Sequence, residues 1–120
     1  MGIKVAKFGG SSVSDAVQLQ KIKDIVEKDD EIRYVVVSAP GKRYKDDTKV
    51  TDLLYLVKAS QEQNVDYDHF LDIIKERYVE SAVGSGIDID YDREFQIITE
   101  KMRRGEASTD YLASRGEYLN

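Results

Sequence analysis

The chain has 120 residues, of which 34% are charged and 41% hydrophobic, and its formal net charge is −5. This length suits one domain or part of one, and the acidic balance argues against binding of nucleic acid or an anionic membrane, since phosphate favours a basic surface. The absence of cysteine excludes disulfides and thiolate chemistry, and a single histidine argues against a metal site. No segment approaches the roughly 20 apolar residues of a membrane span. The N-terminus lacks a signal-peptide pattern, so we expect a cytoplasmic protein.

The N-terminal third predicts a strand, a helix and a second strand. Residues 3–8, IKVAKF, alternate and are rich in strand-forming residues, and two glycines end this strand. Ser14 and Asp15 provide an N-cap signal with an acidic first turn. The apolar residues that follow at helical spacing are Leu19, Ile22, Ile25 and Val26.

Residues 33–38, RYVVVS, form the second predicted strand. Its run of three valines is typical of a strand buried on both faces, as in a parallel sheet. A strand, helix and strand in this order predict a βαβ unit with parallel strands and a right-handed crossover.

The rest of the chain predicts helices. Pro40 and Gly41 break the second strand, and residues 42–49 predict a charged, mobile loop. Helices are expected over residues 51–60, 66–82 and 108–119, and another before Gly105. The side chains expected to face inward are Leu53, Leu54 and Val57 in the first helix, Phe70, Ile73, Ile74 and Tyr78 in the second, and Tyr91, Phe95, Ile98 and Met102 in the helix before Gly105. Ser108 or Thr109 is the expected cap of the last helix.

Two parallel strands cannot form a covered sheet alone. We therefore interpret residues 1–120 as part of one larger α/β domain, with two strands, about five helices and no second domain. Because its strand edges are unpaired, we expect such a chain, when isolated, to dimerise, to undergo domain swapping or to aggregate. The alternative is a small helical protein with one short β-unit.

The junction between the first strand and its helix is a candidate phosphate site. Glycines allow close approach of a ligand, and a helix N-terminus offers unpaired N–H groups and a partial positive charge. Lys7, near the end of the strand, would point at the same place. The alternative is that the Gly-Gly-Ser-Ser stretch only turns the chain and that Lys7 is a solvated charge. The sequence contains neither a Walker A motif nor a dinucleotide-binding glycine fingerprint.

Three polar residues elsewhere have both a functional and a structural interpretation. Ser38 follows the second strand, at the sheet edge where ligands gather in open α/β folds, but it could also be a turn hydroxyl. Thr51 could contact a ligand or begin a helix as part of an N-cap. Glu117 could bind a cation or lie on a solvated helix face.

Four motifs resemble the beginning of an aspartokinase, a member of the amino acid kinase family. They are KFGGSSV at 7–13, VVVSAPGK at 35–42, VTDLL at 50–54 and SRGEYLN at 114–120, in the family's order. Asn120 stands where the family usually has serine. The resemblance covers essentially all of the chain and implies a three-layer αβα fold with a mainly parallel open sheet, of which residues 1–120 form the N-terminal portion.

The resemblance also implies roles for the candidate residues. Lys7 would act catalytically on the phosphates during transfer, and Glu117 would bind the substrate's ammonium group. The complete set is Lys7, Gly9, Gly10 and Ser11 for the nucleotide phosphates, and Ser38, Thr51 and Glu117 for the substrate, with no metal ligands.

The implied reaction is transfer of phosphate from MgATP to the β-carboxylate of L-aspartate, the first step of lysine, threonine and methionine biosynthesis. ATP and Mg2+ are the expected cofactors, and the full protein is expected to be a homo-oligomer. Residues 1–120 alone are expected to have little or no activity. The alternatives are another kinase of this family, forming an acyl or carbamoyl phosphate, and a non-catalytic α/β binding module.

Overall fold

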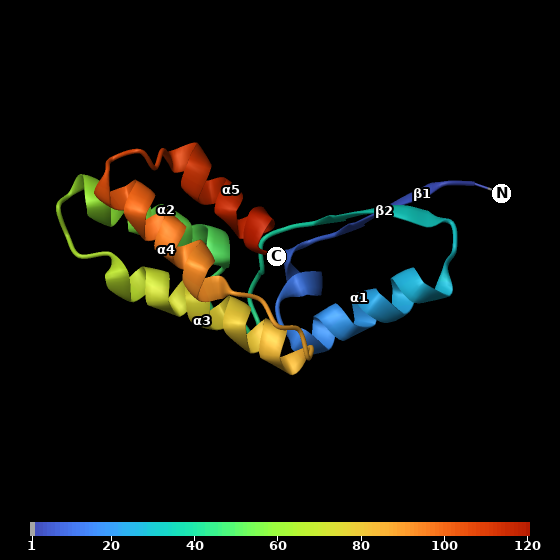
Figure 1. The fold of residues 1–120 in the computed structure, drawn as a ribbon. Helices are drawn as coiled ribbons and strands as arrows, with labels where there is room; N and C mark the ends of the chain where they lie inside the picture. Colours follow the sequence, from blue (N-terminus) through green and yellow to red (C-terminus); the bar gives the residue numbers. More distant parts are fainter. Residues whose placement is uncertain (1) are drawn as a thin grey trace.

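The computed structural model describes residues 2–120, which form two parallel strands, one short 3-10 helix and five α-helices (Figure 1). The α/β class and the expected two strands and five helices are confirmed. In chain order the elements are β1 (Lys4–Phe8), η1 (Gly10–Val13), α1 (Ala16–Lys28), β2 (Ile32–Val37), α2 (Val50–Glu62), α3 (Asp68–Gly84), α4 (Tyr91–Arg103) and α5 (Thr109–Leu119). None of the helices within residues 2–120 combines the length and apolar character needed to cross a bilayer.

The first three major elements form the predicted βαβ unit. β1 pairs with β2 in parallel, and Lys7 lies opposite Val36 in the register. The N-cap of α1 is Asp15, whose side chain accepts a hydrogen bond from the backbone N–H of Gln18 at 2.9 Å. The predicted N-cap signal at Ser14 and Asp15 is confirmed at Asp15, whereas the expected acidic first turn is wrong, because the first turn of α1 contains no acidic residue. The buried hydroxyl of Ser14 instead donates to the carbonyl of Ser11 at 3.1 Å, which tightens η1.

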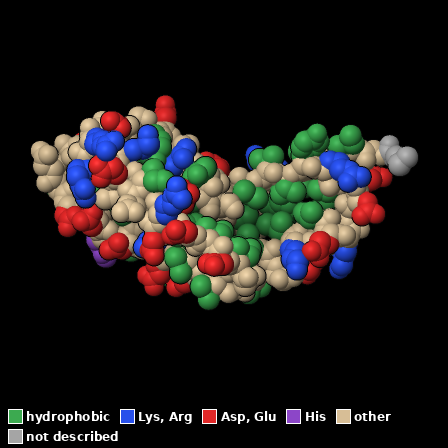
Figure 2. All heavy atoms as spheres, viewed as in Figure 1, with side chains coloured by type: hydrophobic (Ala, Val, Ile, Leu, Met, Phe, Trp, Pro, Cys, Tyr) green, Lys and Arg blue, Asp and Glu red, His purple; other side chains and the backbone are tan. Residues whose placement is uncertain are grey.

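One face of the strand pair is uncovered. Side chains alternate along strands, so the register places Val5, Lys7, Tyr34 and Val36 on a common side, which we call the open face. Val5, Tyr34 and Val36 are 50–65% exposed. The prediction that the valines of β2 are buried on both faces is wrong for residues 2–120. The open face is bare, and α1, which buries none of its own residues, covers the opposite face only in part, so that Val35 is 45% exposed. Figure 2 shows hydrophobic side chains lining the hollow between the strands and α1.

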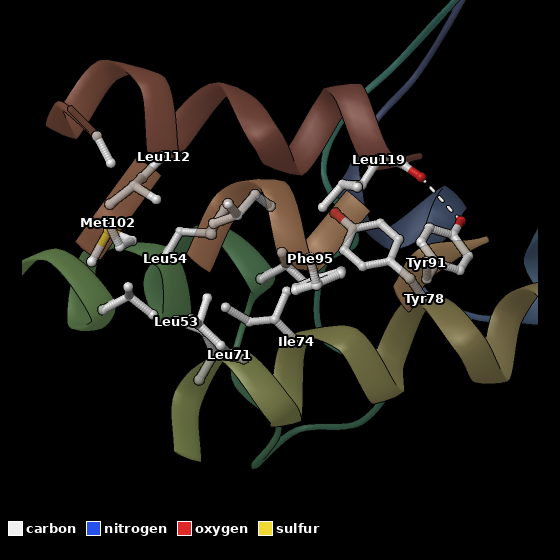
Figure 3. Packing of buried hydrophobic residues seen from close by; sticks show 14 of the residues in the cluster. Leu53, Leu54, Leu71, Ile74, Tyr78, Tyr91, Phe95, Met102, Leu112 and Leu119 are labelled. Carbon is white, nitrogen blue, oxygen red and sulfur yellow. Dashed lines mark hydrogen bonds between the residues drawn. The ribbon is translucent and has the colours of Figure 1, made fainter. Parts of the chain in front are cut away.

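The main core lies between helices α2, α3, α4 and α5, beyond the carboxyl ends of the strands (Figures 1 and 3). The predicted inward faces of α2 and α4 are confirmed. In α3, the buried residues are Leu71, Ile74, Arg77, Tyr78 and Ala82, whereas Phe70 and Ile73 are only partly buried. The buried stripe of α3 is thus rotated from its apolar pattern, because Arg77 and Tyr78 find hydrogen-bond partners inside the fold.

The helix ends follow local sequence signals. Ser108 caps α5 by accepting from the N–H of Tyr111, as expected, and Asp90 caps α4 through Arg93. Gly105, with a φ of +70°, follows α4, and this left-handed geometry favours glycine. These ends orient α5 so that its C-terminus returns to the strands, where the candidate site lies.

Candidate functional site

An open pocket of about 490 Å3 lies at the carboxyl ends of the two strands. Four separate segments line it: η1, the loop after β2, the start of α2 and the end of α5. The lining residues are Gly10, Ser11, Ser38, Ala39, Pro40, Gly41, Lys42, Lys49, Thr51 and Glu117. This is the edge at which open α/β sheets usually bind ligands.

The two strand-end loops meet through glycines. The N–H of Gly41 donates to the carbonyl of Gly10 at 2.8 Å. A Cβ atom on Gly41 would lie 2.8 Å from the carbonyl carbon of Gly10, which is closer than packing permits. The floor of the pocket is therefore bare backbone from both loops, and this allows a ligand to approach peptide N–H groups.

We predict that Gly41→Ala destabilises the fold by about 1–3 kcal/mol, because the added methyl forces the two loops apart. Thermal unfolding of the full natural polypeptide containing these residues would measure the loss. Gly9→Ala is the matched control, since a Cβ there meets no atom within 4 Å. Equal melting temperatures for wild type and Gly41→Ala would contradict the tight contact between the loops.

Helix α5 is held against the end of β2 by contacts on both sides of Glu117. Gly116 packs so closely on Ala39 that a Cβ would lie 2.5 Å from the Ala39 methyl. The hydroxyl of Tyr78, a buried side chain, donates to the Gly116 carbonyl at 2.7 Å. The amide of Asn120 donates to the Ser38 carbonyl at 2.8 Å. Glu117, exposed to solvent, is thereby fixed at the rim of the pocket.

The start of α2 forms another wall. The N–H of Val50 donates to the carbonyl of Pro40 at 3.1 Å, which ties the helix to the loop after β2. Lys49 is the N-cap residue and makes no side-chain capping bond. Thr51 therefore lies in the first turn of α2, beyond the cap, and its side chain lines the pocket. The positive end of the helix dipole faces this region.

The pocket has a mixed charge pattern. Two ammonium groups, from Lys42 and Lys49, and one carboxylate, from Glu117, line it together. Sequence analysis did not assign a role to either lysine. Lys42 could have been identified from its position directly after the Pro-Gly turn that ends β2. For Lys49 the sequence offered only its position before a predicted helix. Such a pocket can accept an anion and an ammonium group side by side.

The structure separates the sequence-predicted site residues into two groups. Gly10, Ser11, Ser38, Thr51 and Glu117 meet in the pocket, although they come from distant parts of the chain. Lys7 and Gly9 do not line it.

Lys7 is exposed on the open face. The expected proximity of its strand to Ser38 is present in the backbone, where the N–H of Ser38 donates to the Phe8 carbonyl at 3.1 Å.

The described residues do not fit a metal site of their own. Within residues 2–120 there is no group of three or more His, Cys, Asp or Glu side chains that could hold an ion. Glu117 is the single carboxylate that lines the pocket. Mg2+ is usually held by one or two carboxylates together with substrate phosphates.

Comparisons with known proteins agree with the motifs. No family model matches the sequence. Over 52 residues, 43% of the chain, the sequence is 60% identical to aspartokinase 3 of Bacillus subtilis strain 168, and this match covers 12% of that protein. Over its whole length, the chain is 42% identical to the crystal structure of Clostridium acetobutylicum aspartate kinase, with a TM-score of 0.94.

The resemblance to the aspartokinases is confirmed. Two structures of Escherichia coli aspartokinase III are similar as well, each at 26% identity over 98% of the chain. One is a T-state complex with lysine and aspartate, with a TM-score of 0.74, and the other an R-state complex with aspartate and ADP, with a TM-score of 0.69. The chain spans 28% of the Clostridium aspartate kinase and 26% of the Escherichia coli aspartokinase chains.

Proposed function

We propose that the full natural polypeptide containing residues 1–120 is an aspartate kinase, which phosphorylates the β-carboxylate of L-aspartate with ATP. The observation that carries this proposal is the pocket itself: Ser38, Thr51 and Glu117 gather at the strand ends beside two lysines. The complex of Escherichia coli aspartokinase III with aspartate and ADP supports the same substrate pair.

Aspartate has a charge pattern that complements this pocket. Its ammonium group would pair with the Glu117 carboxylate, and its carboxylates would accept hydrogen bonds from the hydroxyls of Ser38 and Thr51. Lys42 and Lys49 would balance the negative charge of the carboxylates and of the incoming phosphate. Charge-assisted hydrogen bonds of this kind are stronger than neutral ones and fix the orientation of the ligand.

ATP would place its phosphates over the bare backbone of Gly10 and Ser11, with Gly9 completing the loop. Peptide N–H groups at such a turn bind phosphate oxygens. Lys7 would reach the transferring phosphate from the adjoining strand. Mg2+ would be bound to the nucleotide phosphates, since Mg2+ in kinase sites is usually held by substrate phosphates together with one or two carboxylates.

The reaction requires no protein base or nucleophile. An oxygen of the ionised β-carboxylate attacks the γ-phosphorus, the bond from that phosphorus to the bridging oxygen breaks, and ADP leaves with the bond's electron pair. The products are 4-phospho-L-aspartate and ADP. Positioning and neutralisation of charge supply most of the catalysis in phosphoryl transfer. The proposal includes a place at the first step of lysine, threonine and methionine biosynthesis, a cytoplasmic location and assembly as a homo-oligomer.

An ADP-release assay with trapping by hydroxylamine tests the proposal, because hydroxylamine converts an acyl phosphate to a hydroxamate. The full polypeptide with MgATP and L-aspartate should release ADP and yield aspartyl hydroxamate in equal amounts. L-Glutamate should give at least tenfold less product, since its longer side chain misplaces the attacking carboxylate. ADP release that is independent of aspartate, or that occurs only with carbamate or another acid, would overturn the proposal.

A further inference from the structure

Arg77, in α3, is a buried charged residue that the proposed reaction does not use. Its side chain is only 3% exposed, and it is one of the buried residues of α3. A guanidinium group removed from water costs several kcal/mol unless it is paired and hydrogen-bonded. Its contacts therefore indicate what the residue does.

The guanidinium group donates to three backbone carbonyls, one before α1 and two at opposite ends of the loop that joins β2 to α2. One terminal nitrogen, Nη1, donates to the carbonyl of Thr48 at 3.0 Å. The other, Nη2, donates to the carbonyl of Gly41 at 2.7 Å and to that of Ser14 at 3.2 Å. One side chain thus joins the segment before α1, the loop after β2 and the segment before α2.

Each of these carbonyls lies close to a wall of the pocket. Gly41 lines the pocket itself, and Thr48 directly precedes Lys49, which also lines it. The hydroxyl of Ser14 donates a hydrogen bond to the carbonyl of Ser11, which lines the pocket. The guanidinium group lies behind the pocket and holds three of its walls at a fixed separation.

A network of charges keeps Arg77 in place. The Asp47 carboxylate lies 3.6 Å from Nη1 of Arg77 and forms a bidentate salt bridge with Arg43. Arg43 also forms a salt bridge with Glu80. The Arg43 guanidinium holds the pKa of Asp47 well below its usual range. In the folded protein the carboxylate therefore stays ionised at pH values where an unfolded aspartate, with a pKa of about 4, is already protonated. Its contribution to stability is complete above that pH and is lost as the pH falls below it. Within residues 42–49, for which the sequence predicts a charged, mobile loop, this network includes Arg43, Asp47 and Thr48.

From this geometry we propose that Arg77 is a positioning residue for phosphoryl transfer, setting the separation of the two glycine loops and the start of α2; this inference rests on the proposed kinase function. Lysine cannot replace it fully, because an ammonium group lacks the planar fork that reaches several carbonyls at once. A misplacement of about 1 Å in a transfer site can lower the rate on the order of a hundredfold. Loss of Arg77 should therefore affect turnover in protein that is still folded.

Chemical rescue offers a test that a general loss of stability would not mimic. A small crevice of about 210 Å3, lined by Ser14, Arg43, Arg77 and Glu80 among others, leads to the guanidinium group. Guanidinium ion added at millimolar concentration can enter the space left in Arg77→Ala and bind the same carbonyls. Ethylammonium at equal ionic strength is the control, since it carries the charge without the planar fork.

The experiment compares the full natural polypeptide with Arg77→Ala and Arg77→Lys, measuring kcat, both KM values and folding by circular dichroism. We expect kcat to fall at least tenfold in both variants below their melting temperatures, with a smaller change in the KM for aspartate, and guanidinium to restore activity of Arg77→Ala at least threefold. Arg93→Met is the matched control, an exposed helical arginine on α4.

The possible outcomes separate the two proposals. Suppose that the wild-type protein is active and that Arg77→Lys is folded with a kcat within twofold of wild type. This result would overturn the positioning role of Arg77 but not the proposed kinase function. Equal rescue by guanidinium and ethylammonium also overturns it. If Arg77→Ala fails to fold, the kcat of Arg77→Lys alone tests the positioning role. A parent without aspartate-dependent ADP release overturns the proposed function and this inference with it.

Discussion

Replacing Lys7 by alanine should lower the turnover of the proposed aspartate kinase reaction about a hundredfold or more and leave the fold intact. The ammonium group is expected to stabilise charge that develops between the leaving and transferring oxygens, and losing one such contact costs about 2–4 kcal/mol. The fold should survive because the side chain is exposed on the open face. Steady-state ADP release by the full natural polypeptide gives the turnover, and circular dichroism the folding.

Lys21→Ala is the matched control for this experiment. It removes an exposed lysine from α1, away from the pocket, and should change neither kcat nor melting temperature. The experiment decides whether Lys7 acts on the phosphate although it does not line the pocket formed by residues 2–120. Near-normal turnover of folded Lys7→Ala would refute the catalytic role and turn attention to Lys42 and Lys49, the lysines that line the pocket within residues 2–120.

Replacing Glu117 by glutamine should raise the KM for aspartate about tenfold to a hundredfold. The substitution keeps the size of the side chain but replaces one acceptor oxygen by an NH2 donor and removes the charge opposite the substrate's ammonium group. A hydrogen bond to a charged group is worth about 1.5–3 kcal/mol. The KM for MgATP should change by less than a factor of about three, since the nucleotide is expected at the glycine loop. Initial rates at varied aspartate and varied ATP separate the two constants.

Glu76→Gln, on an exposed position of α3, is the control for removal of one negative charge from the protein. Both variants are assayed with the same substrate at the same pH, so the ammonium group of aspartate has the same charge in both assays. A KM for aspartate that rises only in Glu117→Gln therefore reports the loss of the contact with Glu117. An unchanged KM for aspartate in Glu117→Gln would exclude the ammonium contact. A rise in the KM for ATP alone would instead assign Glu117 to the nucleotide side of the pocket.

Local sequence patterns predicted most of the secondary structure. The helix with Tyr91, Phe95, Ile98 and Met102 on one face is present, and all four residues are buried. The capping serine at the start of α5 and the glycine after α4 were also found where the sequence placed them. These features depend on neighbours within one or two helical turns, so the sequence alone contains the information needed.

Burial was predicted less well where it depends on distant elements. The valines of β2 read as a strand buried on both faces, yet Val35 and Val36 are 45% and 50% exposed. The pattern reports what a strand would bury in a covered sheet. Within residues 2–120 the face with Val36 is uncovered, and α1 covers the opposite face, with Val35, only in part. In α3, the predicted inward residues did not include Arg77, whose partners lie in segments far from it in the sequence.

The amino-acid sequence by itself therefore determined the chain's elements, its glycine-rich strand-end loops and its resemblance to aspartokinases. Only the tertiary structure decided that Ser38, Thr51 and Glu117 share a pocket with Lys42 and Lys49, and that Lys7 stands outside its lining. The reason is that helices and turns form from contacts between near neighbours, whereas the pocket depends on bonds such as that from Asn120 to Ser38, which are 82 residues apart. No spacing rule encodes such a contact, because it follows from how all the elements pack together.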